Sequence, residues 1–184
     1  AIAFIEVLQR GVESLLGIFM TELGETLLQL TELRYRRLPE LMERLQSGDD
    51  YLAGVLQCHL FVESLLEDLI RLCLGRHAEA VLSVQLTFKQ KVAVVGKLEL
   101  EPGWMLVEQE AIGSLRKLNS LRNKLAHRYG HELSEDDIRG LFVGCETTLG
   151  YGDVLDAGIK IGISRYAAFI FGSLLPKYER IEDA

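Results

Sequence analysis

The stretch YLAGVLQCHLFVESLLEDLIRLCL, which is Tyr51–Leu74, decides the fold of this chain. Apolar residues recur in it at steps of three and four, the spacing of one face of an α-helix. Asp50 before it can cap the first turn, and Gly75 after it can end the last turn. We therefore predict one long helix that is buried along one side. The apolar residues expected on that side are Leu56, Leu60, Val62, Leu65, Leu66, Leu69 and Leu72.

The same period continues in both directions and predicts helices throughout the chain. Residues Ile2–Gln46 give one broken helix or two consecutive helices, with Pro39 expected to kink or interrupt them. Leu98–Gly103 is expected to be a loop, and Val81–Thr87 is the one weak candidate for a strand. The expected fold class is therefore all-α. The helices expected after the long one cover residues 77–82, 87–97, 105–129, 134–149 and 153–175.

The composition favours one globular domain. The chain has 184 residues, of which 48% are hydrophobic, which is ample for one buried core. We divide this domain into an N-terminal helical arm over residues 1–46, a core over 51–149 and a C-terminal helix over 153–175. The net charge of -7 argues against broad nonspecific binding of DNA, although it allows a local basic groove.

The cysteines and the apolar stretch near the C-terminal end indicate where in the cell the protein is expected. Cys58, Cys73 and Cys145 are far apart and odd in number, so we expect neither a disulfide framework nor a zinc site. Free thiols and the lack of an evident secretory signal favour the cytoplasm. Val154–Leu175 is apolar, but three charged residues interrupt it. We therefore expect a helix buried in the protein or in an oligomer interface, and no membrane span.

The stretch Arg122-Asn123-Lys124-Leu125-Ala126-His127 bears on function. No acidic residue occurs from Ala111 to His131, although the chain as a whole is acidic. A fixed cation, a carboxamide and an imidazole at the end of one helix are suited to meeting a phosphate group. The basic residues of this window are Arg116, Lys117, Arg122, Lys124, His127, Arg128 and His131.

The helical wheel places these side chains relative to the core. Asn119, Asn123 and His127 form a stripe on the side opposite the inward-facing leucines at 115, 118, 121 and 125. Arg122 lies at the edge of the apolar face, about 140° from His127 on an ideal helix. Its long side chain can wrap toward the stripe, and a second helix or subunit would help the two groups share one anion.

Ordinary structural roles account for the same residues. Asn stripes occur on solvated helix faces, and His127 and Arg128 near a helix C-terminus interact favourably with the helix dipole. Arg122 could pair with the acids at Glu135–Asp137. An Arg-x4-His pattern alone is common by chance, whereas the acid-free window and its flanks favour the functional interpretation.

Arg122–His127, preceded by the amphipathic Leu118–Leu121, resembles the signature of the HEPN superfamily (higher eukaryotes and prokaryotes nucleotide-binding domains). That signature is an Arg, usually with a polar residue after it, and a His a few positions later. Tyr51–Leu74, Leu86–Lys91 and Ser134–Ile138 are also similar to members of this group. The resemblance covers about residues 51 to 149. It implies a HEPN-type helical bundle, often dimeric, to which this chain adds N-terminal and C-terminal helices.

The resemblance further implies a metal-independent endoribonuclease that cleaves single-stranded RNA as a toxin or defence effector, with neither metal nor cofactor. His127 would be the general base or acid, Arg122 would hold the scissile phosphate, and Asn123 would orient His127 or the phosphate. Imidazole exchanges protons near neutral pH, and guanidinium matches phosphate oxygens bidentately. The residues that would bind the substrate are Arg116, Asn119, Lys124 and Arg128.

Two further expectations concern partners. Some HEPN toxins carry a Tyr two positions after the His, which a partner nucleotidyltransferase modifies, and Tyr129 has that place here. A half-buried aromatic residue that closes the helix end is the simpler interpretation of Tyr129. The second functional hypothesis is a non-catalytic regulatory module that resembles the mannitol-operon-repressor type and acts through a protein partner at the bundle surface. An antitoxin would be the corresponding partner of a toxin.

His59 and Glu63 are spaced i and i+4 on the long helix and could bind a metal ion. No third ligand is evident in the sequence. A surface pair or a polar contact in the core is the simpler interpretation.

Overall fold

The long helix is present with the ends that the sequence predicts, because α3 spans Tyr51–Leu74. The Asp50 carboxylate accepts a hydrogen bond from the Ala53 N–H at 3.1 Å, and Gly75 follows the helix at φ 48°. A side chain with a Cβ rarely adopts that conformation, so Gly75 is suited to ending the helix. The computed structural model describes residues 32, 37–48, 50–101, 104–127, 132–144 and 158–174.

The other described elements are mostly helices, which confirms the predicted all-α class. Residues 37–47 are helical, and after α3 the chain forms η1 (Gly75–His77), α4 (Ala78–Leu82), α5 (Phe88–Val95), β1 (Glu99–Glu101), β2 (Trp104–Met105), α6 (Gln109–His127), α7 (Glu135–Phe142) and α8 (Gly158–Ser173).

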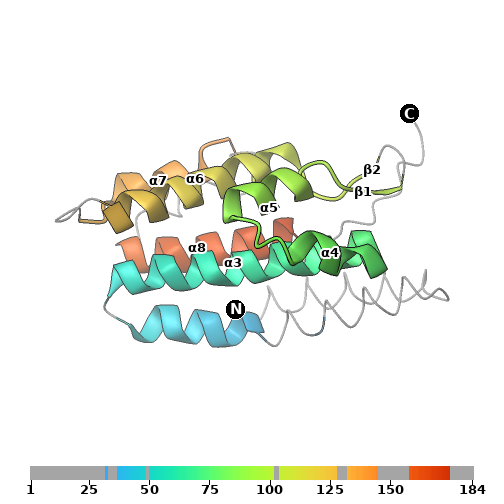
Figure 1. Ribbon diagram of the computed structural model, residues 1–184. Helices are drawn as coiled ribbons and strands as arrows, with labels where there is room; N and C mark the ends of the chain where they lie inside the picture. Colours follow the sequence, from blue (N-terminus) through green and yellow to red (C-terminus); the bar gives the residue numbers. More distant parts are fainter. Residues whose placement is uncertain are drawn as a thin grey trace, which may run out of the picture.

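These helices pack in layers around α3. The chain runs along α3 in one direction and returns along α6 in the other, with α8 beside α3 and the helix over residues 37–47 beneath it (Figure 1). Apolar side chains from α3, α6, α7 and α8 fill the interior, and burying them is the main favourable term in folding. The largest fully buried side chains are Tyr166, Phe142, Phe171, Leu65, Leu66, Leu69, Ile70, Ile112, Leu115, Leu118 and Ile138.

Side-chain caps fix where two of the shorter helices begin. Thr87 and Gln90 form a capping box at the start of α5, and Ser134 and Asp137 form another at the start of α7. Each box satisfies backbone N–H groups that a first helical turn leaves without partners. Both starts were predicted from the sequence at these residues.

A buried polar contact joins α6, α7 and α8. The Ser114 hydroxyl donates to the Leu141 carbonyl oxygen at 2.7 Å, and the Tyr166 hydroxyl lies 3.2 Å from both Ser114 Oγ and Ser114 O. Since all these groups are buried, the contact fixes the register of the three helices.

The predicted loop at Leu98–Gly103 is wrong in part. Glu99–Glu101 pairs antiparallel with Trp104–Met105 as a short hairpin. α6 therefore begins at Gln109, later than predicted, since Met105 belongs to β2. The weak strand candidate Val81–Thr87 is also wrong, because α4 continues to Leu82 and two turn residues follow.

Three smaller expectations also differ from the structure. Residues 37–47 are helical without a break at Pro39. Leu60 is 64% exposed, although it was expected on the buried side of α3. α7 ends at Phe142, earlier than predicted, because Val143 is extended and Gly144 has φ 90°.

α8 lies within the predicted range 153–175, and half of its residues are buried. None of the helices in the described ranges has both the length and the apolar character that crossing a membrane requires. Cys58 is buried and Cys73 half-buried, and both are free thiols. Cys145 lies outside the described residues, as do residues 1–36 of the predicted arm over 1–46, apart from residue 32.

Candidate functional site

α6 carries the predicted motif and turns one face into the core. Leu115, Leu118 and Leu121 are buried, as the wheel predicts, and Leu125 is half-buried against the same cluster. This packing fixes the rotation of α6 about its axis. Asn119 and Asn123, on the other side of the helix, are half-buried and not fully solvated.

A cleft of about 390 Å³ explains why the asparagines are half-buried. It lies where α6 and the first turn of α5 meet α3, and the three helices contact one another. A cleft of this size is within the range of small-ligand sites, roughly 300–1,000 Å³. Its lining residues are His59, Glu63, Thr87, Phe88, Lys89, Asn119, Arg122 and Asn123.

Arg122 is the half-buried cation of this cleft. Its Nη1 donates a hydrogen bond to Asn123 Oδ1 at 3.1 Å. Among the described residues no carboxylate pairs with Arg122, so its predicted pairing with Glu135–Asp137 does not occur there. A guanidinium held by a neutral amide keeps its charge and most of its donors available to a ligand.

His59 forms the deep wall of the cleft and is only 6% exposed. Its ring stacks on Phe88 with the centroids 4.1 Å apart, and Nε2 is buried with no hydrogen-bond partner among the described residues. Burial is the largest effect on His59 and lowers its pKa below the usual value. The positive charges of Arg122 and Lys91 lower the pKa further, whereas the side chain of Asn119 and the negative charge of Glu63 raise it. His59 is therefore neutral at pH 7.

Lys91 balances the acidic side chains next to the cleft. Its Nζ lies 2.7 Å from Glu63 Oε1 and 2.6 Å from Glu67 Oε1, which ties α5 to α3. Burial alone would lower the pKa of Lys91, but the bonds to the two carboxylates outweigh burial and raise the pKa above its usual value. Lys91 therefore stays charged, and the Glu63 carboxylate that lines the cleft is paired with it.

His127 is the last residue of α6 and is exposed. It does not line the cleft, because it lies one helical turn beyond Asn123. The structure thus brings Arg122, Asn123 and Asn119 together and leaves His127 open to solvent beyond them.

Four predicted site residues remain, and the two that the structure describes do not line the cleft. Lys124 pairs with Asp137 at 2.7 Å, which fastens the end of α6 to α7, so this predicted substrate contact already has a partner within the protein. Arg116 is exposed outside the cleft. Arg128 and Tyr129 lie outside the described residues.

His59 and Lys89 line this cleft, although neither was expected there from the sequence. One signal was available for His59, since it lies four residues after the buried Val55 and three before the buried Val62. That spacing places it on the inward face of α3. Lys89 gives no such signal, because its position depends on how α5 meets α6.

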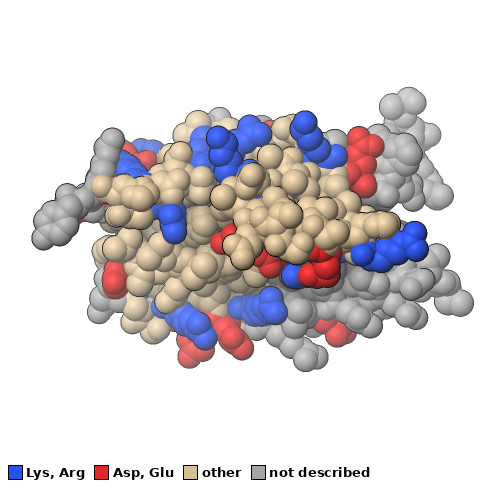
Figure 2. All heavy atoms as spheres, viewed as in Figure 1, with Lys and Arg blue, Asp and Glu red and all other residues tan. Residues whose placement is uncertain are grey.

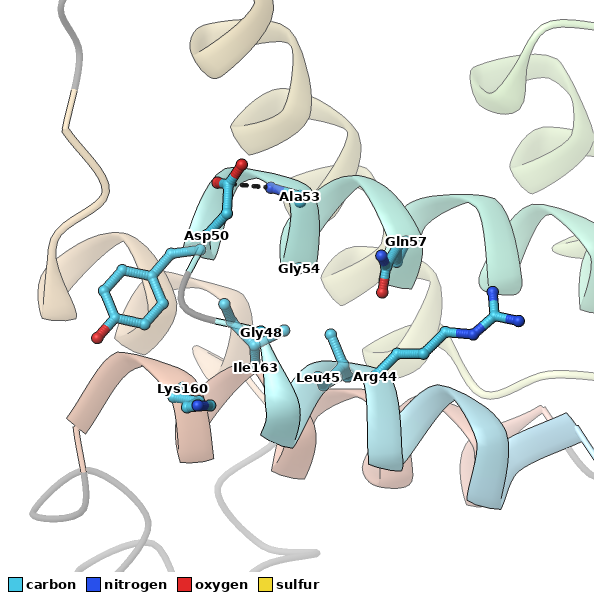
Figure 3. A pocket seen from close by; sticks show the side chains of 10 residues that line it. Arg44, Leu45, Gly48, Asp50, Ala53, Gly54, Gln57, Lys160 and Ile163 are labelled. Carbon is cyan, nitrogen blue, oxygen red and sulfur yellow. Dashed lines mark hydrogen bonds between the residues drawn. The ribbon is translucent and has the colours of Figure 1, made fainter.

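A second pocket, of about 120 Å³, lies where the helix over residues 37–47 turns into α3 beside α8 (Figure 3). Arg44 and Lys160 line it, and the Asp50 carboxylate that caps α3 is at its edge. This pocket is smaller than ligand sites usually are, and its acid already accepts a backbone hydrogen bond.

The cleft has too few ligands for a metal ion. In the described parts of the chain no three His, Cys, Asp or Glu side chains gather closely enough to hold one. His59 and Glu63 therefore remain two possible ligands without a third.

Comparison of the chain with family models, with curated proteins and with solved structures finds no match.

Proposed function

We propose that this protein is a metal-independent endoribonuclease of the HEPN type, which cleaves single-stranded RNA as a toxin or defence effector in the reducing cytoplasm. One observation carries the proposal. Arg122 lines an open cleft with its charge uncompensated by any described carboxylate, while His127 is exposed farther along the same helix. An imidazole and a guanidinium can supply the proton transfer and the charge stabilisation that metal-independent cleavage of a phosphodiester needs.

Each group has a distinct role in the proposed reaction. His127 takes the proton of the ribose 2′-hydroxyl, and the resulting O2′ attacks the adjacent phosphorus. The P–O5′ bond breaks, the leaving O5′ takes a proton from water, and a 2′,3′-cyclic phosphate and a 5′-hydroxyl remain, after which the protonated His127 returns its proton to the solvent. Arg122 stabilises the charge on the phosphate oxygens in the transition state, and Asn123 holds the Arg122 guanidinium through the 3.1 Å bond.

The angle between the two groups supports a dimer. Positions 122 and 127 are about 140° apart on an ideal helix, and only Arg122 lines the cleft. A second copy that brings its own α6 against the exposed end of this helix would supply a facing imidazole to the same phosphodiester. We therefore propose that the active form is a homodimer in which the two α6 helices face each other.

The test is cleavage of a labelled single-stranded RNA in EDTA. Arg122→Ala and His127→Ala should each lower the rate by at least about 100-fold, in line with the loss of a catalytic group. Arg76→Ala and His77→Ala are matched controls, because these exposed residues of η1 lie outside the cleft. Cleavage that persists in the first two variants would refute the proposed roles.

The alternative is a non-catalytic regulatory module of the mannitol-operon-repressor type. It is favoured by the net charge of -7, which disfavours the approach of RNA, and by the Lys124–Asp137 ion pair, which occupies one predicted substrate contact. On this alternative, folded wild-type protein would leave RNA intact and bind a protein partner through the bundle surface.

A further inference from the structure

The cleft contains a polar atom that the described protein does not satisfy. His59 is only 6% exposed, and its Nε2 is buried without a hydrogen-bond partner among the described residues. A buried nitrogen without a hydrogen-bond partner destabilises the folded protein. Because His59 lines the cleft, a ligand that enters beside its ring would supply the partner that Nε2 lacks among the described residues.

The first turn of α5 faces the same cleft. Thr87, Phe88 and Lys89 line it, and the capping box occupies the N–H of Thr87 and that of Gln90. No described acceptor pairs with the N–H groups of Phe88 and Lys89, which the geometry of a helical first turn leaves free. Such N–H groups, together with the helix dipole, favour an anion.

The charges around the cleft also favour the binding of an anion. Lys89 and Arg122 are cations without a carboxylate partner among the described residues, whereas the Glu63 carboxylate is held by Lys91 at 2.7 Å. Figure 2 shows several Lys and Arg side chains over the upper layer, where α5 and α6 lie. The cleft therefore has an excess of positive charge in a protein whose net charge is negative.

We infer that this cleft is a phosphate-binding subsite in which His59 Nε2, Lys89 and the first-turn N–H groups of α5 hold one phosphate group, with Arg122 at its border. The inference rests on the proposed function for the source of the phosphate, which is the RNA backbone next to the cleaved bond.

The geometry of α6 separates this subsite from the proposed scissile position. Asn119, which contacts His59, and His127 are eight residues apart, or about 12 Å along the helix axis. One phosphate cannot contact both ends. Arg122 lies between them, so it can reach the scissile phosphate while the cleft holds a neighbouring one.

The experiment follows the imidazole resonances of His59 by NMR in the intact protein. Inorganic phosphate is titrated first, and then a short RNA with every 2′-hydroxyl methylated, so that it cannot be cleaved. The RNA is used in a 5′-phosphorylated and a 5′-hydroxyl form. We expect a saturable shift of the His59 signal, because a phosphate oxygen accepts from Nε2 and an adjacent anion favours the charged imidazole.

Substitutions of two lysines in or just after α5 provide a test variant and its matched control. Lys89→Ala should weaken phosphate binding roughly five- to tenfold, the effect of about 1–1.4 kcal/mol. Lys97→Ala should leave it unchanged, because Lys97 is exposed just after α5 and does not line the cleft. Equal affinity of the two variants, or no response of His59 to phosphate, would overturn the inference.

The RNA forms distinguish the sources of the phosphate. A response of His59 to both forms supports the internal backbone phosphate, and a response to the 5′-phosphorylated form alone contradicts this source and indicates a terminal phosphate. A response to neither overturns the inference. If His59 responds to phosphate but the wild type cleaves no RNA, only the proposed function fails. If cleavage depends on Arg122 and His127 without any response of His59, only the subsite fails.

Discussion

Replacing Asp137 with Asn should destabilise the protein by roughly 2 kcal/mol at pH 7. Burial alone would raise the pKa of this carboxyl, but the ion pair with Lys124 and the hydrogen bonds from Ser134 outweigh burial and lower the pKa from 3.8 to about 2. The carboxamide in Asp137→Asn would keep an acceptor oxygen for Ser134 and lose the charge. The variant therefore imitates the protonated carboxyl and measures what ionisation contributes.

The sign of the pH dependence follows from the lowered pKa. The contribution of Asp137 is complete above its unfolded pKa of 3.8 and is lost as the pH falls through its folded pKa of about 2. The difference in the free energy of unfolding between wild type and Asp137→Asn should therefore shrink to about half at pH 3.

Urea denaturation at pH 7, 4 and 3 would measure this difference. Asp136→Asn is the matched control, because Asp136 is exposed in the same helical turn and no ion pair with a described residue involves it. We expect the control to stay within about 0.5 kcal/mol of the wild type. Equal losses for both variants, or a difference that does not change with pH, would refute the proposal that the Lys124–Asp137 pair fastens α6 to α7.

Two further substitutions test the packing behind the cleft by thermal unfolding. Gly162→Ala should destabilise the protein by about 1–3 kcal/mol, since its Cβ would lie 2.6 Å from Cγ2 of the buried Ile138, whereas Gly172→Ala in the same helix meets nothing within 4 Å and should be neutral or slightly stabilising. Equal melting temperatures would contradict the close approach of α7 and α8. Tyr166→Phe should cost about 1–2 kcal/mol, because it removes a buried hydroxyl that contacts Ser114, and a variant as stable as wild type would show that this contact contributes nothing.

Local signals explain why much of the helical framework could be predicted. The ends of α3 follow from the Asp50 cap and from Gly75, and the starts of α5 and α7 follow from Thr87 and Ser134. Each of these signals acts within one helical turn, so a single sequence contains it. The inward face of α6 also follows from residue spacing alone.

The cleft could not be predicted because it depends on contacts between distant segments. His59 on α3 and Lys89 on α5 meet the motif residues of α6 only after the three helices pack. Periodicity indicates which face of a helix turns inward, but not which neighbour it meets. For the same reason the sequence allowed Arg122 to pair with the acidic residues of α7. In the structure Lys124 forms that ion pair instead, with Asp137.

The ends of the RNA fragments test the central claim most directly. Wild-type protein is incubated with a labelled single-stranded RNA in EDTA, and the new ends are identified by mass spectrometry. Attack by the 2′-hydroxyl, with Arg122 on the phosphate and His127 taking the proton, predicts 2′,3′-cyclic phosphate and 5′-hydroxyl ends. Intact RNA, or fragments with 3′-hydroxyl and 5′-phosphate ends, would contradict the account.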